Sequence, residues 1–542
     1  MKSKPTKIDM MSRFLLAFLL VLLTGCAATN PVPVTEEAKV DEPIPYYEVA
    51  LGTFERPVTT TSDMAQAYVN QGFQMMYSFA ASEAPATFRE AQKHDNECAM
   101  CYWGEAWSLG SYLNGPMRGE NAPDAYAAIQ KAKELSDNSA SEVEKTLIDA
   151  MLIRYAEEHD SDDRKRRDTL YAEALSEAFE KYPKDTDIGT LYAESLMLLE
   201  PRRGRWSVDD PDVQAIHGVL EDVLSLDIKH PGACHLYIHA TESTTEPGKA
   251  EACAEYLGDA IPGASHINHM PSHTFNRVGR WGDAVRANIQ AWHSDLKAEI
   301  DEGFAIYPSH NLHMLLFAAS MDGQGAIATQ AAKDYAKIID GGNFYHALAL
   351  LRFGRFDEVL ALENAPKREV FRGLWDFAKG YAHLREGDMG KAQKYLERVE
   401  KAAREIPDDK RFRGHTAAEL LGVTGGILKA EIMVSQGRPS QAIAIYEQAI
   451  IIEDSLRYDE PEPLNFSARH WLGALYLDQG EPAKAEAVYL AALEDHPNNG
   501  WCLLGLAQAL EAQGKSSEAE KAMADFEKAW ARADTWIRQS RF

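Results

Sequence analysis

Histidine is the residue type that most strongly suggests chemistry in this chain. Of its 17 histidines, eight lie between residues 235 and 313. His235, His239 and Glu242 are spaced i, i+4 and i+7, so a helix places them within roughly 60° of one another on one face. Two imidazoles and a carboxylate on one stripe form a three-ligand face that suits zinc, copper or non-haem iron.

Two more histidine groups follow the first in the register of a repeat. His269 corresponds to His235 and His273 to His239, at one common offset, and His266 precedes them. His310 and His313 match His266 and His269 after one further repeat and a short insertion. Because neighbouring helices pack about 8–10 Å apart, imidazoles at equivalent positions of three helices can converge on an ion.

A packing role is the alternative interpretation of these histidines. Duplication of a repeat also copies a residue whose ring only hydrogen-bonds the next helix and binds nothing. The sequence leaves open whether the chain holds one ion, two or none, and whether an ion would be zinc, copper or iron. The predicted metal ligands are His235, His239, Glu242, His266, His269, His273, His310 and His313.

Pro271 lies within the second of these groups. A proline inside a helix removes a backbone hydrogen bond and kinks the helix, which would re-aim the neighbouring histidines. A helix that begins only at Ser272 would remove the anomaly. The sequence favours neither alternative.

The elements that must position these side chains are helices. Blocks rich in Ala, Leu, Glu and Lys alternate with short turns at Gly437, Gly480 and Gly514. The spacing from Gly480 to Gly514 equals the period that is typical of tetratricopeptide repeats (TPR), and the earlier spacing adds an insertion to it. We therefore predict an all-α, right-handed solenoid of antiparallel helix pairs over about residues 60–535, whose concave face binds protein or peptide partners.

The N-terminus has the pattern of an export signal. Lys2, Lys4, Lys7 and Arg13 precede the apolar run 14–23, which is too short for a stable membrane span. Leu23-Thr24-Gly25-Cys26 resembles the lipobox of bacterial lipoproteins, which implies cleavage before Cys26 and its acylation. Ala27 follows where Asp would favour the inner membrane, so the resemblance implies an outer-membrane anchor facing the periplasm.

The predicted organisation has four parts. Residues 1–25 are a signal peptide, 26–45 a flexible tether, 46–345 an N-terminal helical region with a histidine-lined groove, and 346–542 the C-terminal TPR repeats. Removal of residues 1–25 takes away four positive charges and one negative charge, so the net charge changes from −27 to −30. Such an acidic chain disfavours nucleic acid as a partner and permits cations.

Five cysteines remain besides Cys26. Cys98-Ala99-Met100-Cys101 lacks the following histidine of a haem-attachment motif. An oxidising periplasm allows a structural disulfide there, although two buried thiols or a redox pair fit the same spacing. The odd number leaves at least one thiol unpaired within the chain.

Several longer motifs together resemble a widespread group of bacterial TPR proteins. The resemblance covers nearly the whole mature chain, implies the TPR fold and carries no particular activity. That group has an Asn-His pair after the equivalent of Phe79, where this chain has Ala80 and Ala81, which puts in doubt any activity that needs this histidine. The motifs are Phe88-Arg89-Glu90-Ala91, Cys98-Ala99-Met100-Cys101-Tyr102-Trp103-Gly104, His235 to Glu242, His269-Met270-Pro271-Ser272-His273 and Asn499-Gly500-Trp501.

Two functions remain open at this point. One is a binding and assembly scaffold, with or without a metal ion in its groove. The other is a metal-dependent oxidase or hydrolase that uses the histidines. The sequence contains no Ser-His-Asp, phosphate-loop or dinucleotide signature that would favour another enzyme class.

Overall fold

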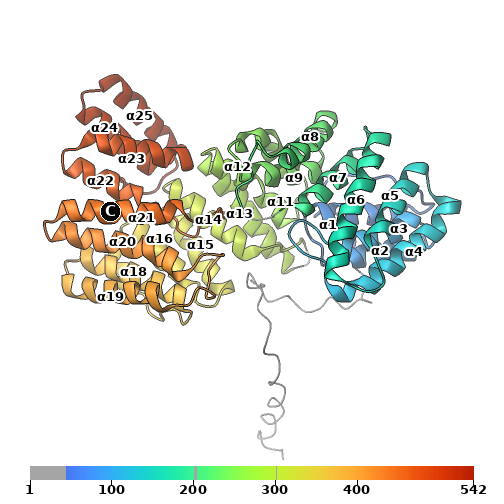
Figure 1. The fold of residues 1–542 in the computed structure, drawn as a ribbon, viewed down its shortest axis with the longest axis horizontal. Helices are drawn as coiled ribbons and strands as arrows, with labels where there is room; N and C mark the ends of the chain where they lie inside the picture. Colours follow the sequence, from blue (N-terminus) through green and yellow to red (C-terminus); the bar gives the residue numbers. More distant parts are fainter. Residues whose placement is uncertain (1–43, 201–203, 301) are drawn as a thin grey trace, which may run out of the picture.

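The computed structural model describes residues 44–200, 204–300 and 302–542. Within these ranges the chain forms helices joined by turns and three isolated β-bridges, and it contains no strand. The all-α solenoid predicted from the sequence is confirmed (Figure 1). Cys26 and nearly all of the predicted tether lie outside the described residues. No described helix is both long enough and apolar enough to cross a bilayer.

The first part of the chain leads up to the first histidine group. Its elements are α1 (Asp63–Tyr77), α2 (Ala84–His94), α3 (Ala99–Ser108), the 3-10 helix η1 (Gly119–Asn121), α4 (Ala122–Ser139), α5 (Glu142–Arg154), α6 (Ser161–Lys181), α7 (Thr186–Leu199), α8 (Pro211–Leu226), α9 (Pro231–Glu242), η2 (Pro247–Ala250) and α10 (Glu251–Leu257).

The second part contains the remaining histidine groups and the C-terminal repeats. Its elements are α11 (Ser265–His269), α12 (Pro271–Arg277), α13 (Trp281–Ala298), α14 (Pro308–Met321), α15 (Gly325–Ile338), α16 (Asn343–Arg352), α17 (Phe356–Ala361), α18 (Glu369–Arg385), α19 (Met389–Glu405), α20 (Ala417–Ser435), α21 (Pro439–Asp454), α22 (Arg469–Asp478), α23 (Pro482–Asp495), α24 (Gly500–Ala512) and α25 (Ser516–Ala529).

One packing device recurs at both ends of the chain. The ring of Phe88 on α2 is wedged between helices α1 and α3, where a Cβ at Gly72 or Gly104 would lie 2.5 or 2.2 Å from it. Tyr489 on α23 is wedged in the same way between α22 and α24, where a glycine of each helix again faces the ring. A large ring on one helix therefore fits only because both neighbouring helices have a glycine there, and this contact fixes how closely the helix pairs stack.

The predicted turns are present at the glycines. Gly437, Gly480 and Gly514 have φ values of 72°, 70° and 74° and end α20, α22 and α24. Glycine adopts this left-handed conformation without steric cost, so each helix stops there and its partner begins within a few residues.

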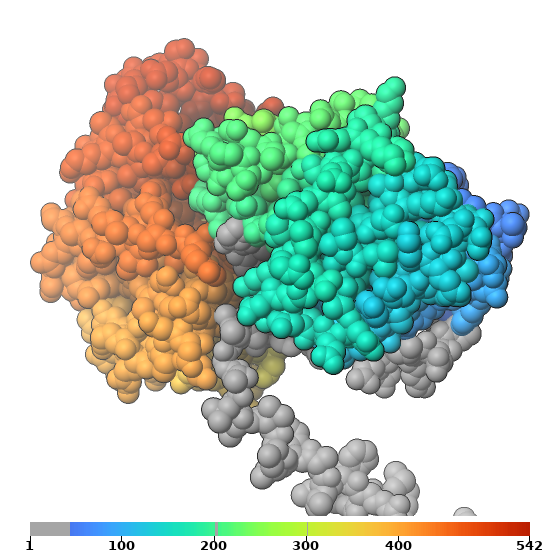
Figure 2. Space-filling view, turned by 45° about the vertical axis from the view of Figure 1, so that its right-hand side comes forward, coloured from blue at the N-terminus to red at the C-terminus, as the bar shows by residue number. Residues whose placement is uncertain are grey.

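The solenoid curls so that its C-terminal end meets its middle. The Trp281 indole donates a hydrogen bond to the Pro497 carbonyl oxygen over 2.9 Å, and Trp501 donates to the Ser320 carbonyl over the same distance. The Arg532 guanidinium pairs with the buried Asp322 carboxylate at 2.6 Å. In Figure 2 the orange and red C-terminal helices stand beside the green middle of the chain. Residues 281–322 in the middle of the chain therefore lie against residues 497–532 near its C-terminal end.

Pro271 begins a helix. α11 ends at His269, and α12 starts at Pro271, whose missing N–H is tolerated in a first turn. Met270 between them keeps helical dihedrals, φ −51° and ψ −39°. Of the two alternatives, a helix that begins late is closer to the structure. The helix begins at Pro271, one residue before Ser272, and the short helix α11 directly precedes it.

Two disulfides form among the described cysteines. Cys98 pairs with Cys101, and Cys234 on α9 pairs with Cys253 on α10. Cys502 is a buried free thiol. The second disulfide fastens the helix that carries the first histidine group to its neighbour.

Candidate metal centre

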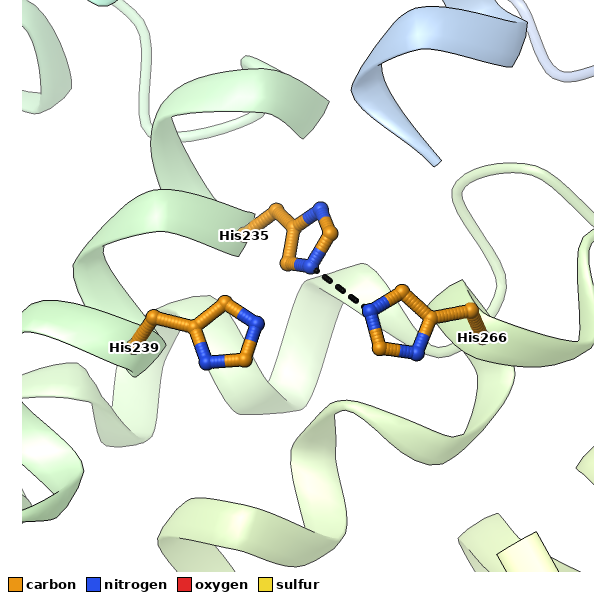
Figure 3. A group of neighbouring side chains, drawn as sticks. All are labelled: His235, His239 and His266. Atoms are coloured by element: carbon orange, nitrogen blue, oxygen red, sulfur yellow. Dashed lines mark hydrogen bonds between the residues drawn. The ribbon is translucent and has the colours of Figure 1, made fainter. Parts of the chain in front are cut away.

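Three histidines from two helices form the first set. His235 and His239 extend from α9 and His266 from α11, and the three rings point toward one another (Figure 3). The Nε2 atoms of His235 and His266 lie 3.2 Å apart. Each of the three residues offers one nitrogen, and these nitrogens all lie within 4.8 Å of one another. All three rings are buried.

A second set lies directly beside the first. It consists of His269 at the end of α11, His273 on α12 and His310 on α14. The Nε2 atoms of His269 and His273 are 2.9 Å apart, and the His310 ring lies 4.7 Å from the His269 ring. His269 and His273 are buried and His310 is partly buried. The two sets are in contact, since the ring centroids of His239 and His273 lie 5.5 Å apart and those of His266 and His269 lie 5.3 Å apart.

Glu242 links the two sets without being at the centre of either. Its Oε1 accepts a hydrogen bond of 2.7 Å from His239 Nδ1, and its Oε2 accepts one from His273 Nδ1. The carboxylate is buried. A carboxylate on the outer nitrogen of an imidazole is the usual partner of a metal-binding histidine, because it orients the ring and makes it more basic. Glu242 occupies this place for one histidine of each set.

The hydrogen bonds fix which nitrogen of each ring carries a proton. An ionised Glu242 only accepts, so His273 carries its proton on Nδ1. His269 Nδ1 lies 3.2 Å from Asn288 Oδ1, whose amide nitrogen is committed to the Ala284 carbonyl, so His269 is also a donor there. When both rings are neutral, both Nε2 atoms bear lone pairs and face each other at 2.9 Å, an arrangement that a cation between them stabilises. When His273 is protonated beside Glu242, its Nε2–H instead donates to His269 Nε2.

In the first set, hydrogen bonds fix the protonated nitrogen of His235 but not that of His266. His235 Nδ1 donates to the Tyr77 carbonyl oxygen over 2.7 Å, which leaves the lone pair of His235 on Nε2. His266 Nδ1 has no hydrogen-bond partner, so His266 can either donate from Nε2 or present a second lone pair. Both sets therefore fit a ring-to-ring hydrogen bond as well as an ion.

The nitrogen separations match those of metal ligands. Two nitrogens at about 2.0–2.1 Å from one zinc ion stand about 2.9 Å apart at a right angle and about 3.3 Å apart at the tetrahedral angle. The observed distances of 2.9 and 3.2 Å lie in this range. Burial and neighbouring imidazoles lower the pKa values of His266, His269 and His310 well below the usual range. These rings are therefore neutral near pH 7, which is the form that binds metal.

The two sets differ in their access to solvent. The ring of Phe79 packs over the first set. Its centroid lies 4.1 Å from the ring centroid of His235, 5.4 Å from that of His266 and 6.0 Å from that of His239. His273 of the second set lines a small cavity of about 20 Å³. Ala80, at the position where the resembled group carries its Asn-His pair, follows Phe79 and is buried.

A buried polar network holds the start of α9. The Asp187 carboxylate accepts from the Tyr77 hydroxyl at 2.5 Å and from His230 Nε2 at 3.1 Å, and Arg56 pairs with it at 3.0 Å. His230 caps α9 by accepting from the Ala233 N–H. Because the Tyr77 carbonyl also accepts from His235, this network positions the first histidine of the set.

Seven of the eight predicted ligands meet at this centre. His313 does not join them, since its Nε2 lies 2.7 Å from the Tyr345 hydroxyl and it belongs to neither set. The sequence interpretation missed Phe79, Tyr77, Asn288 and Glu460, which groups with His239 and Glu242. No spacing rule marks these residues, because each reaches the centre through tertiary contact alone.

Comparisons with known proteins identify the repeats. Three tetratricopeptide repeat family models match residues 377–406, 428–500 and 476–529, so the C-terminal part of the chain consists of TPR units, the repeat type predicted from its turns. TPR units generally bind protein partners. No curated protein matches the sequence significantly.

Solved structures match the chain at low identity and low TM-score. The human IFIT1 dimer with m7Gppp-AAAA is 12% identical, with 87% of this chain and 91% of that chain covered and a TM-score of 0.28. The APC/C hetero-tetramer Cut9-Hcn1 is 13% identical, with 87% and 74% covered and a TM-score of 0.28. The likeness of the chain's motifs to those of the bacterial TPR group remains a resemblance.

Proposed function

We propose that this chain is a lipid-anchored TPR scaffold of the bacterial envelope that binds two transition metal ions. His235, His239 and His266 would hold one ion, and His269, His273 and His310 the other. The grouping of three imidazoles in each set, whose ligand nitrogens lie within 4.8 Å of one another, carries the proposal. Imidazole ligands suit zinc, copper or iron, and three protein ligands leave room for a further one.

Metal analysis of the full-length protein purified from membranes tests the metal sites. After loading with zinc or copper and desalting, we expect two ions per chain. His235→Ala/His239→Ala should remove one ion, His269→Ala/His273→Ala the other, and His239→Ala/His273→Ala both. His313→Ala is the matched control and should retain two. A wild-type protein that retains no more metal than the His239→Ala/His273→Ala variant would overturn the proposal.

The envelope location rests on two features. Residues 23–26 resemble a lipobox after the apolar run 14–23, and the disulfides Cys98–Cys101 and Cys234–Cys253 suit an oxidising compartment. Two or three acyl chains would hold the chain firmly at the membrane, and we favour the outer membrane facing the periplasm.

Fractionation of cells that express the full chain tests the anchor. We expect the wild type in the membrane fraction and nearly all of a Cys26→Ser variant in the soluble fraction, because the variant lacks the acylated thiol. Cys502→Ser is the control for loss of a thiol and should stay with the membrane. A Cys26→Ser protein that remains in washed membranes to the same extent as the wild type would refute lipid anchoring through this residue.

A metal-dependent enzyme is the second candidate, and one observation favours it. His273 of the second set and Glu242 both line the cavity of about 20 Å³, so a water molecule or another ligand of that size would lie beside a three-histidine site. A bound zinc, copper or iron ion would supply Lewis-acid or redox chemistry there. This chain's own residues would orient the imidazoles through Glu242 and Asn288.

A further inference from the structure

A segment after the last helix returns across the C-terminal repeats. Residues 533–542 contain no helix or strand, and in Figure 1 the C mark lies among the labels of α20, α21 and α22. First helices of the pairs line the concave face of a TPR stack, so a segment that contacts them lies in the groove. The segment hydrogen-bonds to the first helix of four successive pairs, through Tyr381 of α18, Glu431 of α20, His470 of α22 and Gln508 of α24.

One basic side chain makes the deepest contact of this segment. Arg541 Nη1 lies 2.7 and 2.6 Å from the two oxygens of the Glu431 carboxylate, which is 3% exposed, and Nη2 lies 3.1 Å from Asp478. Tyr446 also donates to Glu431, but the other cation that pairs with it, Arg385, is 3.8 Å away. A buried carboxylate is costly without a hydrogen-bonded cation, so this position of the groove selects a basic residue.

The residues on either side of the arginine also have fitted places. Ser540 is buried, and its hydroxyl donates to the His470 carbonyl oxygen over 2.6 Å. The Phe542 ring packs on Trp501, with the ring centroids 5.8 Å apart. It also packs on Gly354, where a Cβ would lie 2.8 Å from it. The groove therefore presents a polar, an acidic and an apolar position in succession.

The rest of the segment is largely exposed. Trp536 is 84% exposed although its side chain is large and aromatic, and Ile537 is the one buried residue between 533 and 539. A non-helical segment that is held by a few anchors opens at a lower free-energy cost than the packed helices beneath it. A peptide with the same anchors can therefore take its place.

We propose that the concave groove of the C-terminal repeats binds an extended peptide of a partner protein, in which an arginine precedes an aromatic residue. Segment 533–542 would occupy the same groove and compete with the partner. A tethered segment has an effective concentration on the order of mM, so this competition would weaken partner binding until the segment is displaced. The proposal rests on the scaffold function and names the chemistry of its partner, but it depends on neither the metal sites nor the lipid anchor.

Fluorescence anisotropy with a labelled peptide of residues 533–542 tests the competition on the full-length protein. The Arg541→Ala/Phe542→Ala variant should bind this peptide roughly 10-fold or more tightly than the wild type does, because its own segment has lost two anchors. Trp536→Ala, which removes an exposed aromatic side chain from the same segment, is the matched control and should bind as the wild type does. Equal binding to the double variant and the wild type, or binding to neither, would overturn the proposal whatever the result of the metal analysis.

Two further measurements keep this result decisive. Circular dichroism checks that the variants are folded, and Phe542→Ala alone replaces the double variant if that one is not. Unfolding of Phe542→Ala would make the segment a permanent part of the fold and overturn the proposal. A wild type that dimerises in sedimentation, together with a monomeric double variant, would assign the groove to a second copy of this chain and would overturn the partner.

Altered peptides test the recognition itself, with the Arg541→Ala/Phe542→Ala protein as the receptor. Peptides that carry Arg541→Ala or Phe542→Ala should bind roughly 10-fold or more weakly than the parent peptide, because each loses an anchor in the groove. The peptide with Trp536→Ala should bind like the parent. If the peptide with Arg541→Ala binds as tightly as the parent, the buried acidic position does not select the ligand and the proposal is wrong.

Discussion

A Glu242→Ala variant should lose affinity for both metal ions at once, by about 10–100-fold at each site. The physical reason is that one carboxylate accepts a hydrogen bond from His239 in the first set and another from His273 in the second. Without it, both rings lose the acceptor that fixes their orientation and keeps the Nε2 lone pair available. The measurement is a competition titration with a chelating metal indicator, which resolves two binding constants.

A Glu242→Gln variant separates this linking role from general damage. An amide has one acceptor oxygen and one donor nitrogen, so it can serve only one of the two imidazoles. We therefore expect one binding constant to fall and the other to stay within a few-fold of the wild type. Glu246→Ala, a carboxylate just after α9, is the control and should leave both constants unchanged. Wild-type constants in Glu242→Ala would show that the carboxylate does not support either ion.

The helical repeats were predictable because their signals are local. Turn glycines such as Gly480 and Gly514 mark helix ends within a few residues, and the constant spacing of such turns fixes the helix pair. The curl of the solenoid was not predictable in the same way. The contact of Trp281 with Pro497 depends on small rotations that add up over many helix pairs, and no single turn encodes that sum.

The histidine centre was predictable in composition and less so in grouping. The repeat register correctly indicated that α9 and the helices after residue 265 bring imidazoles together. It suggested that His235 would lie with His269, whereas His235 faces His266 and His269 faces His273. Which rings meet depends on the direction of each side chain and on the break at Pro271, and periodicity specifies neither.

The role of Glu242 shows the same limit at a single residue. The i, i+7 spacing from His235 placed its carboxylate on the histidine face, where a direct ligand was the natural expectation. The structure turns its oxygens toward the outer Nδ1 atoms of His239 and His273. A helical pattern shows that three groups share a face and does not show which atoms point inward.

Asp295 should make the protein less stable as the pH rises from about 4 to 7. It lies on α13, is 5% exposed, and burial raises its pKa to about 7 in spite of hydrogen bonds from Ser265 and Asn311. Between the ordinary pKa of 3.8 and about 7, the folded state holds a proton that the unfolded state has released. Stability therefore falls with rising pH across this window and is flat above it. The difference corresponds to about 4 kcal/mol.

An Asp295→Asn variant should abolish this part of the pH dependence, because asparagine stays neutral and can still accept from Asn311, which donates to Asp295 Oδ2 over 2.9 Å. Urea unfolding of both proteins at pH 4.5 and 7.5 measures it. The variant should gain on the wild type by a few kcal/mol at the higher pH relative to the lower one. Asp340→Asn, at an exposed position, is the control and should show no such gain.

The position of Asp295 makes this variant informative about the metal centre as well. Ser265 precedes His266 on α11, and Asn311 follows His310 on α14, so one buried carboxyl group joins the helices that supply a ligand to each set. Below pH 7 the neutral acid holds these helices together, and above it a buried charge opposes that contact. If Asp295→Asn has the same stability difference from the wild type at both pH values, the carboxyl group is ionised in the folded protein throughout, and burial does not control it.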